Sequence, residues 1–269
     1  MERKINNALE TSSIVLILTG TIKPHEANLT LYNDINKRKL DYIKSLAFYL
    51  KNTNLNIVFC ENSGYNLNND INLDDYNNRL EYLTFNGSDL IKEKGKGYGE
   101  IEILEYALKY SSFLKNASFI IKITGRLRIL NLDKLLHLFN SNKRKDIILN
   151  LYSPWGGVAT ECFLIKKSFL SQIIINYKDK INDRSFQIED VILDAIINSK
   201  DIKVHKFFPY IKGICGGDLT YYKKESTYRL KGNYYYCLRY IQKQKGYMFK
   251  SFLSYLNYCY FRMINLIID

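Results

Sequence analysis

The chain has 269 residues, with 39 Lys and Arg against 27 Asp and Glu, and a formal net charge of +12. Its length suits one large α/β domain plus a tail, and it has no apolar run of about 20 residues, which argues against a transmembrane helix. The five cysteines and three histidines lack the paired spacing of a metal centre, and no secretory signal opens the sequence. We therefore expect a globular protein of a reducing cytoplasm whose positive charge serves an anionic partner: a nucleotide, a nucleic acid or an acidic membrane surface.

The first half of the chain predicts strands that alternate with helices. Residues 13–18 form a short, continuous apolar run, which is typical of a central parallel strand. Residues 33–52 have helical spacing, with Asp34 as the expected N-cap. The expected apolar face of this helix contains Leu40, Ile43, Leu46, Ala47 and Leu50. Further strands are expected over 56–60 and 80–85, with an exposed loop over 66–78 between them.

Residues 92–131 carry the strongest functional signal. A basic, glycine-rich loop over 94–99 precedes an expected helix over 100–113, and an expected strand over 119–123 ends in the polar segment 122–126. Glycines allow a backbone to approach a phosphate, and the first turn of a helix offers free N–H groups to an anion. Five basic side chains bracket the place, namely Lys94, Lys96, Lys122, Arg126 and Arg128. We interpret it as a diphosphate pocket; the alternative is a solvated basic turn beside an ordinary strand end.

The second half continues the alternation. Helices are expected over 132–140, 167–177 and 191–198, and strands over 146–151, 160–165 and 204–211. Pro154–Gly157 is a tight loop with the only tryptophan, Trp155, which can stack on a sugar ring or simply pack. Glu189 and Asp190 open the last helix, where acids are also favoured by the helix dipole alone.

The composition changes at Thr220. The tail over 220–269 holds nine Lys and Arg against two acids, and eleven of the 23 tyrosines. Its apolar residues recur at three- and four-residue steps, which predicts one or two helices with a basic side and an aromatic side. Such helices can bind an anionic membrane surface, or they can pack on the preceding domain. We expect a catalytic domain over 1–219 and this tail over 220–269.

The order of these motifs resembles the nucleotide-sugar glycosyltransferases of the GT-A fold. That family has a glycine-rich loop, an Asp-x-Asp motif and a later Glu-Asp motif. The first matches Gly95–Gly99 and the third matches Ile188–Asp190, and the order covers the chain to about residue 218. Segments 17–24, 57–64 and 122–126 look like those of bacterial enzymes that build capsule and lipopolysaccharide O-antigen. The resemblance implies an α/β fold with a mixed, Rossmann-type sheet flanked by helices.

One landmark departs from the family pattern. Thr124-Gly125-Arg126 stands where Asp-x-Asp would hold a divalent ion against the departing diphosphate. Arginine and lysine can neutralise phosphate oxygens in place of a metal. We therefore expect no metal and no cofactor, and a metal-independent transfer of sugar from a nucleotide-sugar substrate.

The resemblance assigns the site residues as follows. Asp190, or its neighbour Glu189, is the general base of an inverting transfer, with Asp190 preferred. Trp155 and Gly156 contact the acceptor, a glycan or lipid-linked oligosaccharide. The donor and its diphosphate meet Thr19, Gly20, Thr21, Lys23, Glu61, Asn62, Lys94, Lys96, Gly97, Lys122, Thr124, Gly125 and Arg126. The expected location is the cytoplasm, at the inner face of the cytoplasmic membrane.

Two other functions fit the same sequence. The charge and the Tyr/Lys-rich tail suit a protein that binds single-stranded nucleic acid, since aromatic rings stack on bases and lysines meet phosphates. No recognised nucleic-acid-binding signature supports that function. The chain could also be an inactive binding module of a polysaccharide-assembly complex.

Overall fold

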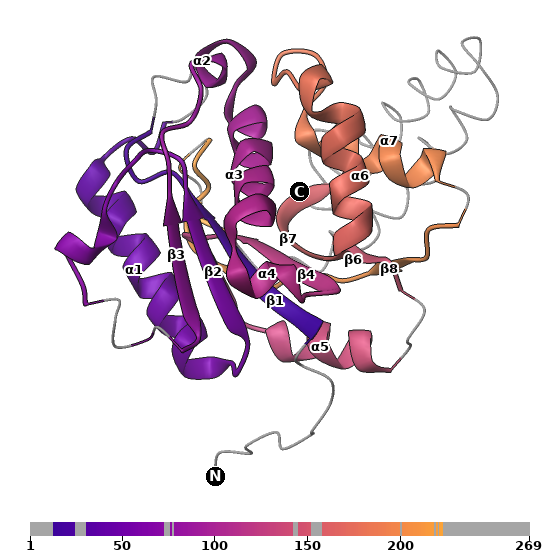
Figure 1. Ribbon diagram of the computed structural model, residues 1–269, viewed down its shortest axis with the longest axis horizontal. Helices are drawn as coiled ribbons and strands as arrows, with labels where there is room; N and C mark the ends of the chain where they lie inside the picture. Colours follow the sequence, from indigo (N-terminus) through magenta and orange to yellow (C-terminus); the bar gives the residue numbers. More distant parts are fainter. Residues whose placement is uncertain are drawn as a thin grey trace, which may run out of the picture.

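The computed structural model describes residues 13–24, 31–72, 76, 78–141, 145–151, 158–199, 201–217, 219 and 221–222. A seven-stranded sheet in the order β3-β2-β1-β4-β7-β6-β8 runs through this part of the chain, with helices on both faces (Figure 1). The expected α/β class with a mixed, helix-flanked sheet is confirmed. The strands are β1 (Ile14–Gly20), β2 (Asn56–Glu61), β3 (Leu80–Thr84), β4 (Phe119–Thr124), β5 (Arg128–Ile129), β6 (Ile147–Asn150), β7 (Ala159–Lys166), β8 (Val204–Lys206) and β9 (Ile211–Lys212). The helices are α1 (Ile35–Asn52), α2 (Leu90–Lys94), α3 (Lys96–Tyr110), α4 (Ser112–Lys115), α5 (Leu132–Asn140), α6 (Lys167–Tyr177) and α7 (Ile188–Asn198), with 3-10 turns η2 (Leu67–Asn69) and η4 (Lys178–Lys180).

Strand β1 is the central parallel strand that the sequence predicted. It pairs in parallel with β2 on one side and β4 on the other. Every residue of β1 is buried, because both faces of the strand are covered. Val15 and Ile17 pack in one core cluster, whereas Leu16 and Leu18 pack in the other.

The two core clusters correspond to two helical layers. Helices α3, α6 and α7 contribute to the cluster on one face of the sheet, and α1 and α5 contribute to the cluster on the other face. Lys122 of β4 lies two residues after Ile120, so the two side chains lie on the same face of the sheet. Ile120 belongs to the core cluster that α3, α6 and α7 cover. The side chain of Lys122 therefore faces that layer, on the same side of the sheet as the start of α3.

Strand β7 is the one strand of this sheet that runs against the others. It pairs antiparallel with both β4 and β6, whereas β8 is parallel to β6. The first residues of β7 therefore lie at the same edge as the carboxyl ends of β1, β2 and β4. Pairing of Ile123 with Cys162 places Thr160 and Glu161 beside the end of β4. This reversal brings acidic and hydroxyl side chains to the edge where open sheets bind ligands.

Several predicted boundaries were wrong. Helix α3 begins at Lys96, so the glycine-rich segment is mostly helix and not loop. The expected strand over 204–211 is divided between β8 and β9, and β9 pairs with β5 in a separate small sheet. Helix α7 begins at Ile188, which confirms that Glu189 and Asp190 lie in its first turn.

The helix α1 and its cap were predicted correctly, but its buried face only in part: Leu46 is buried and Ile43 and Leu50 pack against the core, whereas Leu40 and Ala47 are exposed. The Asp34 carboxylate accepts the Lys37 amide. Leu40 is 49% exposed, so it lies outside the packed face. The buried positions are Arg38, Tyr42, Ser45, Leu46 and Tyr49. Apolarity misled the prediction because an arginine, a serine and two tyrosines occupy most of the inner face.

Candidate functional site at the carboxyl edge of the sheet

The glycine-rich turn at the start of α3 binds a carboxylate of the same chain. Asp183 accepts the Lys96 amide at 2.8 Å and the Gly97 amide at 3.1 Å. A Cβ at Gly95 would lie 2.4 Å from the Asp183 carboxyl, and one at Gly97 would lie 2.7 Å from it. Gly95 has φ +99°, a conformation that side chains other than glycine rarely adopt. The helix terminus predicted for phosphate thus holds Asp183, and the glycines allow that carboxylate to approach.

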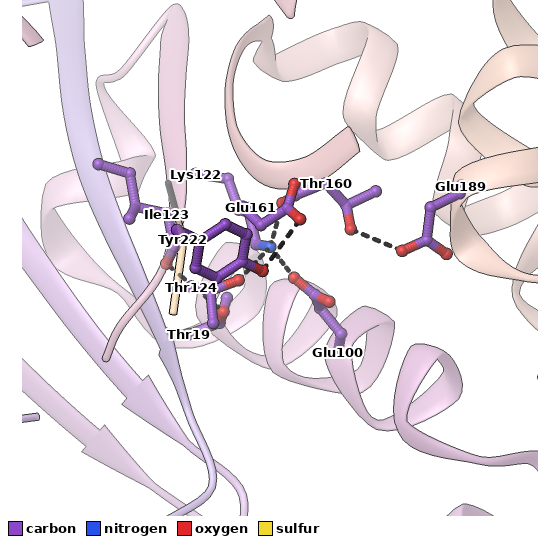
Figure 2. A network of polar contacts seen from close by, with 9 residues as sticks. All are labelled: Thr19, Glu100, Lys122, Ile123, Thr124, Thr160, Glu161, Glu189 and Tyr222. Atoms are coloured by element: carbon purple, nitrogen blue, oxygen red, sulfur yellow. Dashed lines mark hydrogen bonds and ion pairs between the residues drawn. The ribbon is translucent and has the colours of Figure 1, made fainter. Parts of the chain in front are cut away.

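Lys122 is not the exposed phosphate contact that we expected. Its side chain is fully buried, and its ammonium forms an ion pair with Glu100 of α3. It also donates to the Thr160 carbonyl at 2.6 Å and to the Thr124 hydroxyl at 3.2 Å, as Figure 2 shows. These three acceptors match the three protons of an ammonium group. Burial lowers the pKa of Lys122 to about 8, although Glu161 and Glu189 nearby oppose the shift.

Two more predicted donor contacts have internal roles. Glu61 is 0% exposed, and it accepts the Tyr65 amide at 2.7 Å and the Ser63 hydroxyl at 2.5 Å. It therefore organises the loop after β2. The Lys94 ammonium donates to the Asp179 carbonyl at 3.0 Å and lies 4.7 Å from the Tyr98 ring, so it is attached to η4.

The loops after β1 and β2 are joined to one another. The Thr21 hydroxyl donates to Asn62 at 2.6 Å, and the Lys23 amide donates to the Ser63 hydroxyl at 3.0 Å. Thr19, Gly20 and Asn62 are buried. The Gly125 amide donates to the Thr19 carbonyl at 2.8 Å, which ties the end of β4 to the end of β1. The structure thus brings these predicted residues together at one edge of the sheet.

Arg38 is a site residue that the sequence reasoning missed. The residue is 4% exposed, and its guanidinium donates to the Thr21 carbonyl from Nε at 2.9 Å and to the Tyr32 carbonyl from Nη1 at 2.7 Å. It fixes the chain that follows β1. Arg38 lies four residues before Tyr42 and seven before Ser45, so the three residues share one face of α1. This spacing was the signal in the sequence that Arg38 belongs to the buried face.

Arg126 and Lys96 lie on either side of the turn at Gly216 and Gly217. Arg126 Nη1 donates to the Ile214 carbonyl at 2.8 Å, and its guanidinium lies 5.6 Å from the Tyr32 ring. A Cβ at Gly216 would meet Arg126 Nη2 at 2.7 Å, and one at Gly217 would meet Lys96 Nζ at 3.5 Å. In the described part of the chain, neither cation forms an ion pair with a carboxylate. Their charges are therefore available to an anion.

Glu189 is an acidic group whose carboxylate lies close enough to Lys96 to be influenced by its charge. Its carboxylate accepts the Thr160 hydroxyl at 3.0 Å (Figure 2). Burial raises the pKa of Glu189 above its ordinary value and Glu161 adds to this, whereas the Thr160 hydrogen bond and Lys96 oppose it. Glu161 itself accepts the Tyr222 hydroxyl at 3.1 Å. Glu100 and Glu161 are further site acids that the sequence reasoning missed, because only the fold brings α3 and β7 to β4.

Some predicted features lie outside the described residues. These are Trp155, Gly156 and all of the tail over 220–269 except Tyr221 and Tyr222. Within the described residues, no group of three His, Cys, Asp or Glu side chains is arranged to hold a metal ion. The same residues contain no helix with the length and hydropathy to cross a membrane.

Comparison with known proteins gives distant likenesses only. No protein-family model matches the chain, and the search of curated proteins finds no significant match. Solved structures with a similar fold include the 4-diphosphocytidyl-2C-methyl-D-erythritol synthase of Anaerococcus prevotii, at 10% identity and TM-score 0.47, covering 85% of this chain and 98% of that one. A cytidylyltransferase of Leptospira borgpetersenii has 16% identity and TM-score 0.43, with 78% of this chain and 79% of that one covered. A glycosyltransferase involved in glycosylation of the PBCV-1 major capsid has 10% identity and TM-score 0.44, over 72% and 81% of the two chains. Likenesses of this size concern the fold alone.

Proposed function

We propose that the chain is a glycosyltransferase that moves a sugar from a nucleotide-sugar donor to a glycan acceptor. The observation that carries the proposal is that Lys96 lies near Glu189 and, across Gly216 and Gly217, near Arg126, and that neither cation has an ion-pair partner among the described residues. The cations suit a diphosphate leaving group, and the acid suits proton removal from an acceptor hydroxyl. Both lie at the carboxyl edge of the sheet, where the resemblance to the GT-A fold places the donor.

The diphosphate contacts in this proposal are fewer than the sequence implied. Arg126 offers a planar guanidinium, and exposed Lys96 adds a mobile point charge. Lys122 and Lys94 are engaged with Glu100 and Asp179, so they contribute through position and charge rather than through direct contact. The N–H groups of Lys96 and Gly97 are satisfied by Asp183, so the phosphates are held by side chains.

Glu189 is the proposed general base. Its carboxylate takes the proton of the acceptor hydroxyl as that oxygen forms a bond to the anomeric carbon. The bond from this carbon to the phosphate oxygen breaks at the same time, and the nucleoside diphosphate leaves with the electron pair. The sequence alone favoured Asp190. The structure gives Glu189 the hydrogen bond to Thr160 and the proximity to Lys96.

The remaining assignments come from the resemblance. We propose inversion at the anomeric carbon, an acceptor such as a lipid-linked oligosaccharide of a bacterial surface polysaccharide, and acceptor contacts by Trp155 and Gly156. We also propose that the tail over 220–269 attaches a cytoplasmic enzyme to the anionic inner leaflet.

Donor binding is the first test of this function. We expect one of UDP-, GDP-, dTDP- or CMP-sugars to raise the melting temperature, because a ligand at 100 times its dissociation constant stabilises by about 2.7 kcal/mol. Arg126→Met and Lys96→Met should each weaken that binding, since a hydrogen bond to a charged group contributes about 1.5–3 kcal/mol. Thermal shift and titration calorimetry measure both effects.

Lys51→Met is the matched control, because Lys51 is an exposed lysine in the last turn of α1, away from the carboxyl edge. It should bind donor as the wild type does. Equal donor binding by Arg126→Met, Lys96→Met and wild type would contradict the diphosphate assignment. Tight, salt-dependent binding of single-stranded oligonucleotide without donor binding would favour the nucleic-acid function instead.

Metal independence is a separate expectation. Sugar transfer should continue in EDTA, because Thr124-Gly125-Arg126 offers no carboxylate to a metal and the cations neutralise the leaving group. The measurement is the transfer rate with and without chelator. Loss of activity in EDTA that Mn²⁺ or Mg²⁺ restores would show that a metal is required.

A further inference from the structure

Thr160 joins two polar groups of the site that are otherwise separate. Its carbonyl accepts the buried Lys122 ammonium at 2.6 Å, and its hydroxyl donates to Glu189 Oε1 at 3.0 Å. Thr160 is 6% exposed and lies in β7 beside the end of β4. Figure 2 shows the three residues in one line, with Lys122 on the side of Glu100 and Glu189 on the far side of Thr160.

We propose that Thr160 and Lys122 are positioning residues for Glu189: Lys122 fixes the Thr160 backbone, and the Thr160 hydroxyl fixes the Glu189 carboxylate in the orientation that accepts a proton. This inference rests on the proposed function of Glu189 as the base. The Thr160 hydroxyl bonds to Oε1, and in this proposal Oε2 takes the proton of the acceptor. The rest of β7 anchors Thr160, because the strand pairs with β4 from Cys162 onward and with β6 at Ala159 and from Phe163 onward.

The reversed direction of β7 makes this arrangement possible. In a parallel strand, the residues at the carboxyl edge would be the last of the strand, followed by a loop. Here Thr160 is the second residue of an eight-residue strand whose following residues are hydrogen-bonded to β4 and β6. A side chain within a sheet is held more precisely than one on a loop. Glu189, in the first turn of α7, therefore bonds to a fixed donor.

The charged groups around Glu189 come from three neighbouring elements. Lys96 of α3 and Lys122 of β4 favour the ionised carboxylate, whereas Glu161 of β7 disfavours it. Asp190 adjoins it in the same turn. Removal of the Thr160 hydroxyl should therefore leave Glu189 under burial and the repulsion of Glu161, with only its own backbone amide and the lysines to oppose them. The pKa of Glu189 should rise.

The test is a titration of Glu189 in Thr160→Val, Thr160→Ser and wild type. Carboxyl carbons of ¹³C-labelled glutamate are followed by NMR, and Glu189→Gln identifies the resonance. Valine keeps the volume of threonine and removes the donor, whereas serine keeps the donor. We expect the pKa of Glu189 to rise by about 1 in Thr160→Val, from the size of a hydrogen bond to a charged group, and to stay close to wild type in Thr160→Ser.

Lys122→Met should change the same titration in the same direction. Lys145→Met is its control, because Lys145 is also a buried lysine, 3% exposed, but bonds to the Leu138 carbonyl and lies outside the site. It should leave Glu189 unchanged. An unchanged titration in Thr160→Val would overturn the proposal even if Lys122→Met failed to fold.

The rate profile completes the experiment. In Thr160→Val, the acidic limb of the pH profile of kcat should move to higher pH by the same amount as the pKa of Glu189. The KM for the donor should stay near the wild-type value. A shifted titration with an unshifted limb would overturn the positioning role. A wild-type protein that transfers no sugar from any tested donor would contradict the proposed function itself, and the NMR titration would still decide the contact between Thr160 and Glu189.

Discussion

Glu189→Gln is expected to slow sugar transfer by about 10²–10⁴-fold while donor binding stays near the wild-type value. Glutamine keeps the shape of the side chain and can still accept the Thr160 hydroxyl, but it cannot take the proton of the acceptor. The measurements are single-turnover transfer rates and calorimetric donor affinity. The loss should be in kcat, because the base acts in the chemical step and makes no contact with the donor in this scheme.

Asp190→Asn is the matched control for this substitution. Both acids lie in the first turn of α7, and adjacent helical residues point about 100° apart, so only one can face the acceptor. We expect Asp190→Asn to reduce mainly stability, by less than about 1 kcal/mol from the lost interaction with the helix dipole. A large loss of rate in Asp190→Asn with a normal rate in Glu189→Gln would exchange the two roles. Normal rates in both would place the base elsewhere.

The second large effect is expected at the buried ion pair. Lys122→Met should lower the free energy of unfolding by about 3–5 kcal/mol, because it leaves Glu100 without its counter-charge in a partly buried site. The double variant Lys122→Met, Glu100→Gln should recover part of this loss, since it removes both charges. Urea unfolding of wild type, Lys122→Met, Glu100→Gln and the double variant gives the coupling free energy. Equal losses in the single and the double variant would show that Glu100 is not the partner that matters.

The same lysine should make stability depend on pH. Burial lowers the pKa of Lys122 to about 8, whereas an unfolded lysine has a pKa of about 10.4. Between these values the unfolded chain holds more protons, so the Lys122 contribution to the free energy of unfolding rises with pH. Below pH 8 both states are protonated and the contribution is constant. The difference in stability between wild type and Lys122→Met should therefore increase from pH 8 to pH 10, and a difference that decreases over this range would contradict the assignment.

The sequence predicted the sheet better than the site. Segments 14–18 and 119–121 lie in strands that are covered on both faces of the sheet, and that burial is visible in the sequence as continuous apolarity. The direction of β7 is invisible in such runs, so the sequence could not place Thr160 and Glu161 at the carboxyl edge. Local sequence patterns also do not reveal long-range partners. Glu100 is predicted only as a helix residue, and its ion pair with Lys122 depends on the packing of α3 against β4.

Basic residues gave the least reliable predictions. Lys94, Lys96, Lys122 and Arg126 look alike in the sequence. In the structure Lys122 pairs with Glu100 and Lys94 bonds to the Asp179 carbonyl of η4, whereas Lys96 and Arg126 lie beside the turn at Gly216 and Gly217. A lysine between isoleucines in a strand can only point into a packed layer, and Lys122 does so. The position of Lys122 between Ile121 and Ile123 was therefore a signal of burial in the sequence. The prediction overlooked it because the many basic residues nearby favoured a phosphate contact.

The contact of Asp183 with the start of α3 has a consequence for relatives of this chain. Gly95 and Gly97 lack side chains because a carboxylate 86 residues or more along the chain approaches them, so the three positions form one steric and charge constraint. Any larger residue at Gly95 would collide with Asp183, and loss of Asp183 would remove the need for glycine at Gly97. In homologous sequences these positions should therefore covary. A glycine pair at 95 and 97 would then be a signature of the loop before α7.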